Sequence, residues 1–286
     1  MYCGRFAPTP SGELHLGSVL TAVGAYLRAK SEHGLIGLRI EDLDPARCRE
    51  QSVSSILGDL RLLGLRFDGR TVYQSRRTGF YRETLARLVN SGQAYYCSCT
   101  RHSLRLGPCR CHLRQDALPR GGAVRFKPRE RAPAFFIDER LGRLEPEPEG
   151  TPLTLRRGDG IFAYNLACVA DDAAEGVTEV VRGADLIAVT PPQLALFRAL
   201  GARAPKFLHL PLVTGSDGRK LSKQNRAARA LSLGSPREIL FRALALLGQD
   251  VSYYRADLDP QSVLREAVRR FSLAATGRSL RAPGGP

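Results

Sequence analysis

The sequence contains no tryptophan, a single methionine and very little lysine. Its 43 basic residues are nearly all arginines, and the five lysines stand at positions 30, 127, 206, 220 and 223. It also lacks any apolar run approaching the ~20 residues that a transmembrane helix needs. The first residues, MYCGRFAPTPSG, place an arginine and two prolines where a signal peptide carries its apolar core. We therefore expect a cytoplasmic protein rather than a membrane-spanning or secreted one.

The length and composition are those of a folded globular protein. With 286 residues, 43% of them hydrophobic and 25% charged, the chain can form one large domain or two modest ones. The net charge of +15 and the isoelectric point of about 10.0 favour a polyanionic partner, because a basic surface releases counterions from a phosphate backbone. An arginine-rich proteome would produce the same excess, so charge alone indicates nucleic-acid binding only weakly.

Apolar strands and amphipathic helices alternate through residues 1–92. Tyr2–Phe6 and Leu35–Ile40 are apolar stretches of strand length, and a helical pattern follows each of them. The predicted helices cover Leu16–Lys30, Val53–Leu63 and Phe80–Val89. Strand–helix order of this kind implies a parallel sheet covered by helices. We predict an α/β fold, with residues 1–92 as the first half of the sheet domain.

The pattern changes after residue 92. Residues 93–158 are rich in Cys, Arg, Pro and Gly and contain short extended stretches such as AVRFK and AFFID, so we interpret them as an insertion. The α/β pattern returns at 159–212, the predicted second half of the sheet domain. Residues 213–286 hold a basic loop and then helices, which a capping box at Ser235–Glu238 and the pair Asp259-Pro260 open. The last residues, 278–286, are expected to be frayed.

The stretch GELHLGS lies between the first predicted strand and the first predicted helix. In a parallel sheet the crevice at the carboxyl ends of the strands is the usual ligand site, and a helix N-terminus there suits phosphate. Gly12 and Gly17 permit a close approach of the backbone, and His15 can donate a hydrogen bond to a phosphate oxygen. The alternative is that His15 only caps or packs the turn.

Two of the five lysines, Lys220 and Lys223, lie three residues apart in the stretch GRKLSKQN. A lysine ammonium is a compact point charge on a flexible stem, whereas an arginine guanidinium is a planar fork, so the two differ at a phosphate. The choice of lysine in a chain dominated by arginine indicates a phosphate ligand. The alternative is a solvated basic turn.

Together these two stretches resemble the signature motifs of the class I aminoacyl-tRNA synthetases, His15-Leu16-Gly17-Ser18 as the first and Lys220-Leu221-Ser222-Lys223-Gln224 as the second. The resemblance implies a Rossmann-type catalytic domain in which a carboxylate attacks the α-phosphorus of Mg²⁺-bound ATP. It implies catalytic roles for His15, Lys220 and Lys223, since charge on the departing pyrophosphate must be stabilised in the transition state. The residues that it implies for ATP binding are Gly12, His15, Gly17, Ser18, Ser222 and Lys223.

Three further segments, GRFAPTPSG, RIEDLDPAR and FAYNLACVADD…VTEVVRGADL, are similar to the glutamyl-specific branch of this family. That resemblance implies that Arg5 meets a substrate carboxylate, that Glu41 binds the α-ammonium group, and that Tyr164 and Arg182 complete the pocket. The full set that it implies for glutamate is Arg5, Ala7, Thr9, Glu41, Tyr164 and Arg182. A dicarboxylic amino acid suits two cationic contacts and one anionic one. The alternatives are a solvated strand end for Glu41 and a core aromatic residue for Tyr164.

Four of the seven cysteines, Cys97, Cys99, Cys109 and Cys111, fall within fifteen residues. Two C-x-C pairs can close a tetrahedral zinc site, whereas a disulfide framework is not expected in the cytoplasm. The glutamyl branch often carries zinc here, with a tyrosine four residues before the last cysteine. This sequence has Arg105 at that position, so Cys111 or His112 would supply the fourth ligand. We predict one structural zinc per chain, with four free thiols as the alternative.

Only 63 residues follow Lys223, too few for the helical anticodon-binding region of a full glutamyl-tRNA synthetase. The chain looks most like a truncated paralogue of that enzyme, which attaches glutamate to the queuosine base of tRNA(Asp) and works on the anticodon loop itself. We therefore expect the tRNA(Asp) anticodon stem-loop, ATP and L-glutamate as partners of a monomer, with the basic surface and the insertion guiding the RNA. The alternatives are a short synthetase that charges a tRNA 3′ end and a tRNA-binding relic without activity.

Overall fold

The predicted alternation of strands and helices places β1 (Cys3–Phe6), α1 (Leu16–Ser31), β2 (Leu35–Ile40), α2 (Glu50–Leu62) and β3 (Val72–Tyr73) in order along the chain. β1 pairs in parallel with β2, and β2 with β3, because each connection returns through a helix or a long loop. The structure, a computed structural model, describes residues 1–113, 122–147, 151–214, 228–253, 255, 257–277 and 281–283. The predicted Lys220, Ser222 and Lys223 lie outside these residues.

The other elements of the described residues follow in chain order. They are η1 (Gln74–Arg77), α3 (Thr78–Asn90), β4 (Ala94–Cys97), α4 (Arg101–Leu106), η2 (Cys111–Leu113), β5 (Ala123–Phe126), β6 (Phe136–Asp138), β7 (Gly142–Leu144), β8 (Thr154–Arg156), α5 (Tyr164–Ala174), β9 (Glu179–Gly183), η3 (Ala184–Leu186), α6 (Thr190–Ala199), β10 (Lys206–Leu210), β11 (Leu212–Thr214), η5 (Ala230–Ser232), α7 (Pro236–Leu246), α8 (Pro260–Arg270), η6 (Ala274–Thr276) and β12 (Arg281–Pro283).

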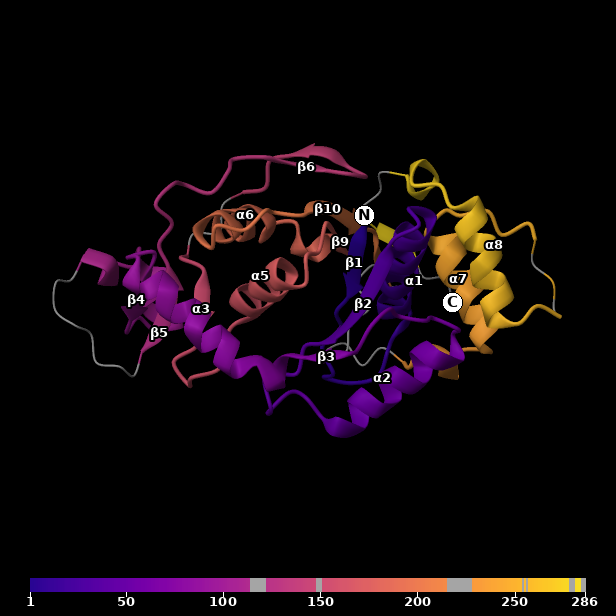
Figure 1. The fold of residues 1–286 in the computed structure, drawn as a ribbon, viewed down its shortest axis with the longest axis horizontal. Coiled ribbons are helices and arrows are strands. Elements are labelled where there is room, and N and C mark those ends of the chain that lie inside the picture. Colours follow the sequence, from indigo (N-terminus) through magenta and orange to yellow (C-terminus); the bar gives the residue numbers. More distant parts are fainter. Residues whose placement is uncertain are drawn as a thin grey trace.

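The second half of the sheet domain is built on β9 and β10, which are parallel and in register from Lys206↔Glu179 to Leu210↔Gly183. Just before β9, the backbone N–H of Thr178 donates to the carbonyl of Cys3 at 2.8 Å, so β9 lies beside β1. The strands from the two halves of the chain thus lie side by side in the centre of the molecule (Figure 1). The predicted α/β fold with parallel strands is confirmed.

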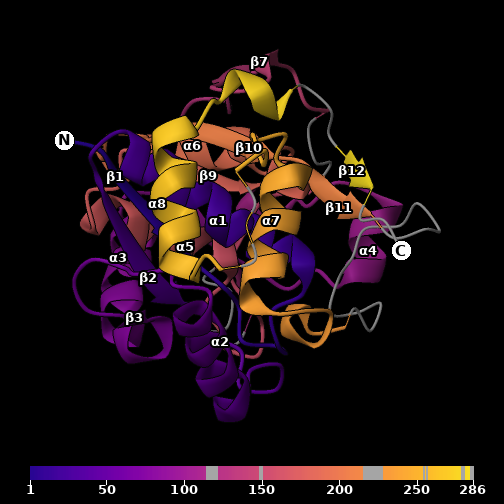
Figure 2. The ribbon, with the colours of Figure 1, turned by 90° about the vertical axis from the view of Figure 1, so that its right-hand side faces the viewer.

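Side chains of β9 and β10 alternate between two hydrophobic clusters. Val181 and Leu208 pack in a cluster with α1, α7 and α8, whereas Val180 and Phe207 pack in another with α5 and α6. Figure 2 shows α1, α7 and α8 side by side on one face. Helix α1 approaches the sheet so closely that a Cβ at Gly24 would lie 2.5 Å from Leu210 Cδ1. Both faces of the strands are therefore covered, as is usual for parallel sheets.

Residues 93–158 divide between two places. β4, β5 and β8 form an antiparallel sheet, which lies at the left of Figure 1. β6, the predicted extended stretch AFFID, instead pairs in parallel with β10 through Phe207↔Asp138, and β7 pairs antiparallel with β6. The predicted boundaries at 92, 158 and 212 stay a prediction, but part of the insertion lies in the same sheet as β9 and β10.

The C-terminal helices begin where their capping residues predict. Ser235 and Glu238 form a complete capping box at α7, and the Asp259 side chain accepts hydrogen bonds from the backbone N–H groups of Gln261 and Ser262 at α8. The expectation of a frayed end was wrong for Arg281–Pro283, which pair in parallel with β11 as β12. Among the described residues, no helix combines the length and the apolar character needed to cross a membrane.

Candidate active site

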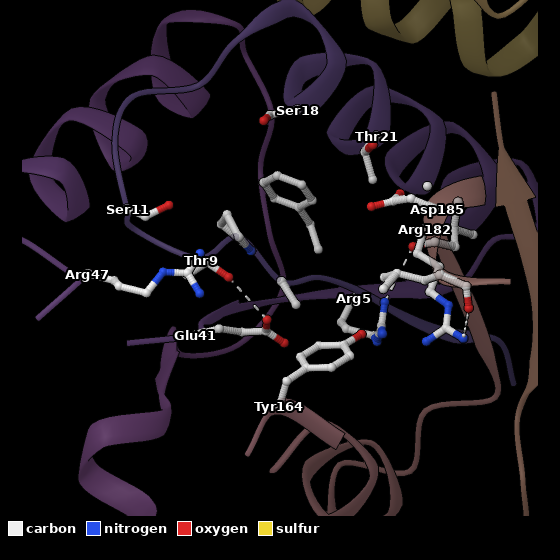
Figure 3. Close-up of a pocket in the computed structure, with 16 residues that line it drawn as sticks. Arg5, Thr9, Ser11, Ser18, Thr21, Glu41, Arg47, Tyr164, Arg182 and Asp185 are labelled. Atoms are coloured by element: carbon white, nitrogen blue, oxygen red, sulfur yellow. Dashed lines mark hydrogen bonds between the residues drawn. The ribbon is translucent and has the colours of Figure 1, made fainter. Parts of the chain in front are cut away.

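A cavity of about 610 Å³ opens where β1, β2 and β9 end and where α1 and α5 begin. Figure 3 shows its side chains converging from these elements. Seven of the residues predicted for ATP or glutamate line it, namely Arg5, Ala7, Thr9, Ser18, Glu41, Tyr164 and Arg182. The other lining residues are Phe6, Pro8, Ser11, Thr21, Arg47, Val181, Gly183, Asp185 and Leu186. Three segments far apart in sequence therefore meet at the carboxyl ends of the strands, the usual ligand site of such a sheet.

His15 is the N-cap residue of α1, next to this cavity. The backbone N–H of Ser18 donates to its Nδ1 at 3.2 Å, and the Ser18 hydroxyl lies 3.1 Å from its Nε2. A Cβ at Gly17 would lie only 3.2 Å from the His15 ring, so glycine leaves room for the ring over the first turn. His15 therefore has the capping role that was weighed as an alternative, and it holds this role at the helix end where a phosphate would bind.

Arg5 projects from β1 beneath the cavity and is 4% exposed. Its Nε and NH2 groups donate to the two carboxylate oxygens of Asp172 at 2.9 and 3.3 Å, and NH1 donates to the Val181 carbonyl at 3.4 Å. Arg39 donates to the same carboxylate at 2.8 Å. Burial alone would raise the pKa of Asp172, but Arg39 and Arg5 lower it to about 2. The positive charge of Arg5 is thus balanced inside the protein.

Glu41 follows β2 and faces the cavity from the side opposite Arg182 (Figure 3). The Thr9 hydroxyl lies 3.5 Å from its Oε2, and Arg39 lies 3.9 Å from its Oε1. Burial raises the pKa of Glu41 to about 7, although Arg39 and Arg5 act to lower it. A buried carboxylate with this pKa is well suited to a cationic ligand. Burial disfavours its ionised form, and an ammonium group beside it would favour that form again.

Arg182 on β9 is as buried as Arg5, but its surroundings differ. Its guanidinium group donates to Gln193 Oε1 and Thr190 Oγ1, both at 2.7 Å, to the Leu186 carbonyl at 3.2 Å, and to His209 Nε2 at 3.1 Å. In the part of the chain that the structure describes, none of its hydrogen-bond partners is a carboxylate. Arg182 is therefore held by neutral acceptors, which leave its positive charge to a ligand in the cavity, where the Asp185 carboxylate also lies.

Nine lining residues were not predicted as site residues, and four of them carry polar side chains, namely Ser11, Thr21, Arg47 and Asp185. Ser11, Arg47 and Asp185 stand within the segments GRFAPTPSG, RIEDLDPAR and VVRGADL, so the motifs contained a signal for them. Thr21 lies one helical turn after Ser18 and carried no such signal. Burial raises the pKa of Tyr164, so its phenol stays protonated and can donate a hydrogen bond into the cavity.

The four clustered cysteines lie at the junction of β4 and η2, away from this cavity. Their sulfur atoms all lie within 4.8 Å of one another, with Cys97–Cys109 at 3.5 Å, Cys99–Cys109 at 3.8 Å and Cys99–Cys111 at 3.6 Å. Zinc at ~2.3 Å from four sulfurs places them roughly 3.8 Å apart, so this donor set fits a tetrahedral metal ion. Cys111 supplies the fourth sulfur, whereas the His112 ring packs edge-on against Tyr95.

The comparisons with known proteins agree with this geometry. The sequence profile of the family described as tRNA synthetases class I (E and Q), catalytic domain, matches residues 3–116 and 114–273. The glutamyl-Q tRNA(Asp) synthetase of Yersinia pestis is 45% identical over 279 residues, which cover 96% of this chain and 86% of that protein. The protein of the same name from Salmonella paratyphi A is 43% identical over 288 residues, covering 97% and 94%.

A solved structure is similar over the whole chain. The crystal structure of a glutamate tRNA ligase from Elizabethkingia meningosepticum in complex with its amino acid has a TM-score of 0.79 at 24% identity, covering 99% of this chain and 67% of that one. This likeness shows the fold, and the sequence relatives show the family. The chain belongs to the class I (E and Q) tRNA synthetases and, within them, to the glutamyl-Q tRNA(Asp) synthetases.

Proposed function

We propose that the protein activates L-glutamate with ATP and transfers the glutamyl group to the queuosine base in the anticodon loop of tRNA(Asp). The observation that carries glutamate specificity is the pairing of opposite charges across the cavity. Arg182 offers a positive charge without an acidic hydrogen-bond partner among the described residues, and Glu41 offers a buried carboxylate on the other side. This arrangement suits an amino acid with a carboxylate at the end of its side chain, which lies far from its α-ammonium group.

In the first step, an oxygen of the glutamate α-carboxylate attacks the α-phosphorus of ATP, and the bond to pyrophosphate breaks. We assign the nucleotide, with its Mg²⁺, to the N-terminus of α1, where Gly12, His15, Gly17 and Ser18 lie. Lys220 and Lys223, together with Ser222, would stabilise the departing pyrophosphate mainly in the transition state, where binding accelerates the reaction. Arg5, Ala7, Thr9 and Tyr164 would complete the glutamate site.

In the second step, a hydroxyl of the queuosine cyclopentenediol attacks the acyl carbon of glutamyl-adenylate. AMP leaves, an ester bond forms and the hydroxyl proton is released. The relatives named glutamyl-Q tRNA(Asp) synthetase support this acceptor. We assign a structural zinc to Cys97, Cys99, Cys109 and Cys111. This zinc would stabilise the fold of the region that we propose to approach the RNA. We further propose a monomer that works in the cytoplasm, where its tRNA is.

The test is glutamate-dependent ATP–pyrophosphate exchange without tRNA, with aspartate and glutamine as controls. We expect exchange with glutamate alone. The acceptor is then tested with queuosine-containing tRNA(Asp) whose 3′ end is blocked by a phosphate, compared with an unmodified transcript. Labelling of the blocked tRNA would support the base as acceptor, whereas labelling that needs a free 3′ hydroxyl would show an enzyme that charges the 3′ end. Absence of both exchange and transfer would indicate a relic that only binds RNA.

A further inference from the structure

The guanidinium group of Arg182 is held on one side by a histidine that lies outside the cavity. His209 on β10 is fully buried, and its Nε2 accepts the hydrogen bond from Arg182 Nε at 3.1 Å. A histidine nitrogen can accept only when it carries no proton, so this contact requires the tautomer that is protonated at Nδ1. Whatever fixes the tautomer of His209 therefore also decides whether this contact, one of four that hold Arg182, can form.

Asp138 fixes that tautomer. Its Oδ2 lies 2.7 Å from His209 Nδ1 and accepts from the His209 backbone N–H at 3.0 Å. Its Oδ1 accepts from the backbone N–H groups of Arg140 and Leu141 at 3.0 and 2.9 Å. Three backbone N–H groups thus donate to this carboxylate, which acts as an acceptor, so His209 carries its proton at Nδ1 and turns a lone pair toward Arg182.

Aromatic packing keeps the imidazole ring in this orientation. The Phe207 ring is stacked on it with a centroid distance of 6.2 Å and an interplanar angle of 9°, and Phe136 packs against it edge-on at 5.8 Å. Arg182 also lies over the Phe207 ring, with its guanidinium carbon 5.0 Å from the centroid. Asp138, on β6, and His209, on β10, are neighbours because β6 pairs with β10.

We propose that Asp138 and His209 are positioning residues for glutamate selection: they hold Arg182 through a neutral hydrogen-bond acceptor, which fixes the guanidinium group without balancing its charge. This inference rests on the proposed function. A carboxylate placed directly on Arg182 would hold it equally well but would cancel the charge, as Asp172 does for Arg5. The neutral imidazole between Asp138 and Arg182 holds the guanidinium group but leaves its charge to the ligand. That charge favours glutamate, which has a side-chain carboxylate, over glutamine.

The test variant is Asp138→Asn. When its amide oxygen keeps the bonds to Arg140 and Leu141, its NH2 group takes the place of Oδ2 and loses the bond from the His209 backbone N–H. The NH2 group then faces His209 Nδ1 and favours the tautomer protonated at Nε2, which turns a donor toward the Arg182 donor. A change from aspartate to asparagine reverses a histidine tautomer in the same way in serine proteases. We expect the KM for glutamate in ATP–pyrophosphate exchange to rise about 10- to 100-fold, with a smaller change in kcat, since a bond to a charged group is lost.

Two further variants separate positioning from a loss of stability. Glu179→Gln is the matched control, because Glu179 is also a buried carboxylate at the sheet but pairs with Arg28 and Tyr2, away from the cavity. We expect it to lower the melting temperature while the KM for glutamate stays within about twofold. His209→Phe removes the acceptor, so adding Asp138→Asn to it is expected to raise the KM no further.

The ratio of exchange with glutamate to exchange with glutamine is measured on the same variants. A fall of this ratio in Asp138→Asn, but not in Glu179→Gln, is the expected result. An Asp138→Asn protein that folds and keeps the wild-type KM and ratio would overturn this inference alone. A wild-type protein without glutamate-dependent exchange would overturn the proposed function, and this inference with it.

Discussion

Arg5 and Arg39 bind the same carboxylate oxygen, with distances of 2.9 and 2.8 Å to Asp172 Oδ1. Arg5 lies on β1, Arg39 lies on β2 and Asp172 lies on α5. The shared carboxylate therefore links the two strands at the floor of the cavity to helix α5. Both arginines are almost fully buried. The position of Arg5 in the cavity therefore depends on an acidic residue of a distant segment.

Replacing Asp172 is expected to destabilise the fold strongly. Asp172→Asn removes the carboxylate that pairs with Arg5 and one of the carboxylates that pair with Arg39, and breaking a buried ion pair from one side costs about 3–5 kcal/mol. Urea denaturation would measure the loss. The control is Glu130→Gln, whose exposed pair with Arg198 is expected to contribute less than about 1 kcal/mol. Equal midpoints for the two variants would contradict the proposed balance.

The ion pairs of Asp172 with Arg5 and Arg39 also predict how the stability of the fold changes at low pH. The pKa of Asp172 is lowered from its ordinary value of 3.8 to about 2, so its contribution is present above pH 3.8 and is lost as the pH falls through about 2. The difference in unfolding free energy between the wild type and Asp172→Asn is therefore expected to shrink over that interval. A difference that stays constant down to pH 2 would show that the carboxylate is not held in its charged form.

Glu41 predicts the pH dependence of glutamate activation. Since burial raises its pKa to about 7 and the ionised form is proposed to bind the ammonium group, kcat/KM for glutamate should rise about tenfold per pH unit below that value and level off above it. Exchange assays across this range would show the limb. Glu41→Gln should abolish it, and a limb that persists in this variant would belong to another group.

The contribution of Glu41 to the stability of the fold depends on pH in the direction opposite to that of Asp172. Its raised pKa stabilises the fold below its ordinary pKa of 4.5, and this contribution is lost as the pH rises through about 7. Glu41→Gln mimics the protonated form, so its melting temperature should increase relative to the wild type over the same interval. A constant difference between the two proteins would contradict the raised pKa.

Lys223→Ala is expected to lower pyrophosphate exchange by about 100-fold or more with little loss of stability, since the ammonium group is proposed to act on the transition state. Lys206 provides the control, because it is one of the five lysines and is exposed at the start of β10. Lys206→Ala should leave exchange unchanged. Near-normal exchange in Lys223→Ala would refute the proposed role.

The fourth metal ligand can be settled by metal analysis. We expect purified wild-type protein to hold one zinc per chain, and Cys111→Ala to lose most of it and to melt at a lower temperature, since structural zinc contributes directly to folding. His112→Ala should keep the metal, because the Cys111 sulfur completes the group of four. Retention of zinc by Cys111→Ala together with its loss in His112→Ala would reverse this assignment.

Much of the local structure was predictable because its causes lie within a few residues. The strand Leu35–Ile40 occupies the predicted residues, and the capping box at Ser235 forms as its spacing indicates. The cysteine spacing placed four sulfurs in one group, but it left Cys111 and His112 as alternatives. The frayed end was predicted wrongly because the pairing of Arg281–Pro283 with β11 depends on a strand far away in the sequence.

The sequence by itself determined the order of strands and helices, the helix caps and the chemical groups that the motifs bring to the site, since each depends on neighbouring residues. Only the tertiary structure decided which partners hold those groups. Arg5 meets Asp172 across 167 positions and Arg182 meets His209 across 27, although the chain offers many other acceptors. The choice follows from strand order and packing, which bring a carboxylate within reach of Arg5 but neutral acceptors within reach of Arg182, and which bury both arginines. The two buried arginines of the site therefore differ in charge balance, a difference that their motifs do not contain.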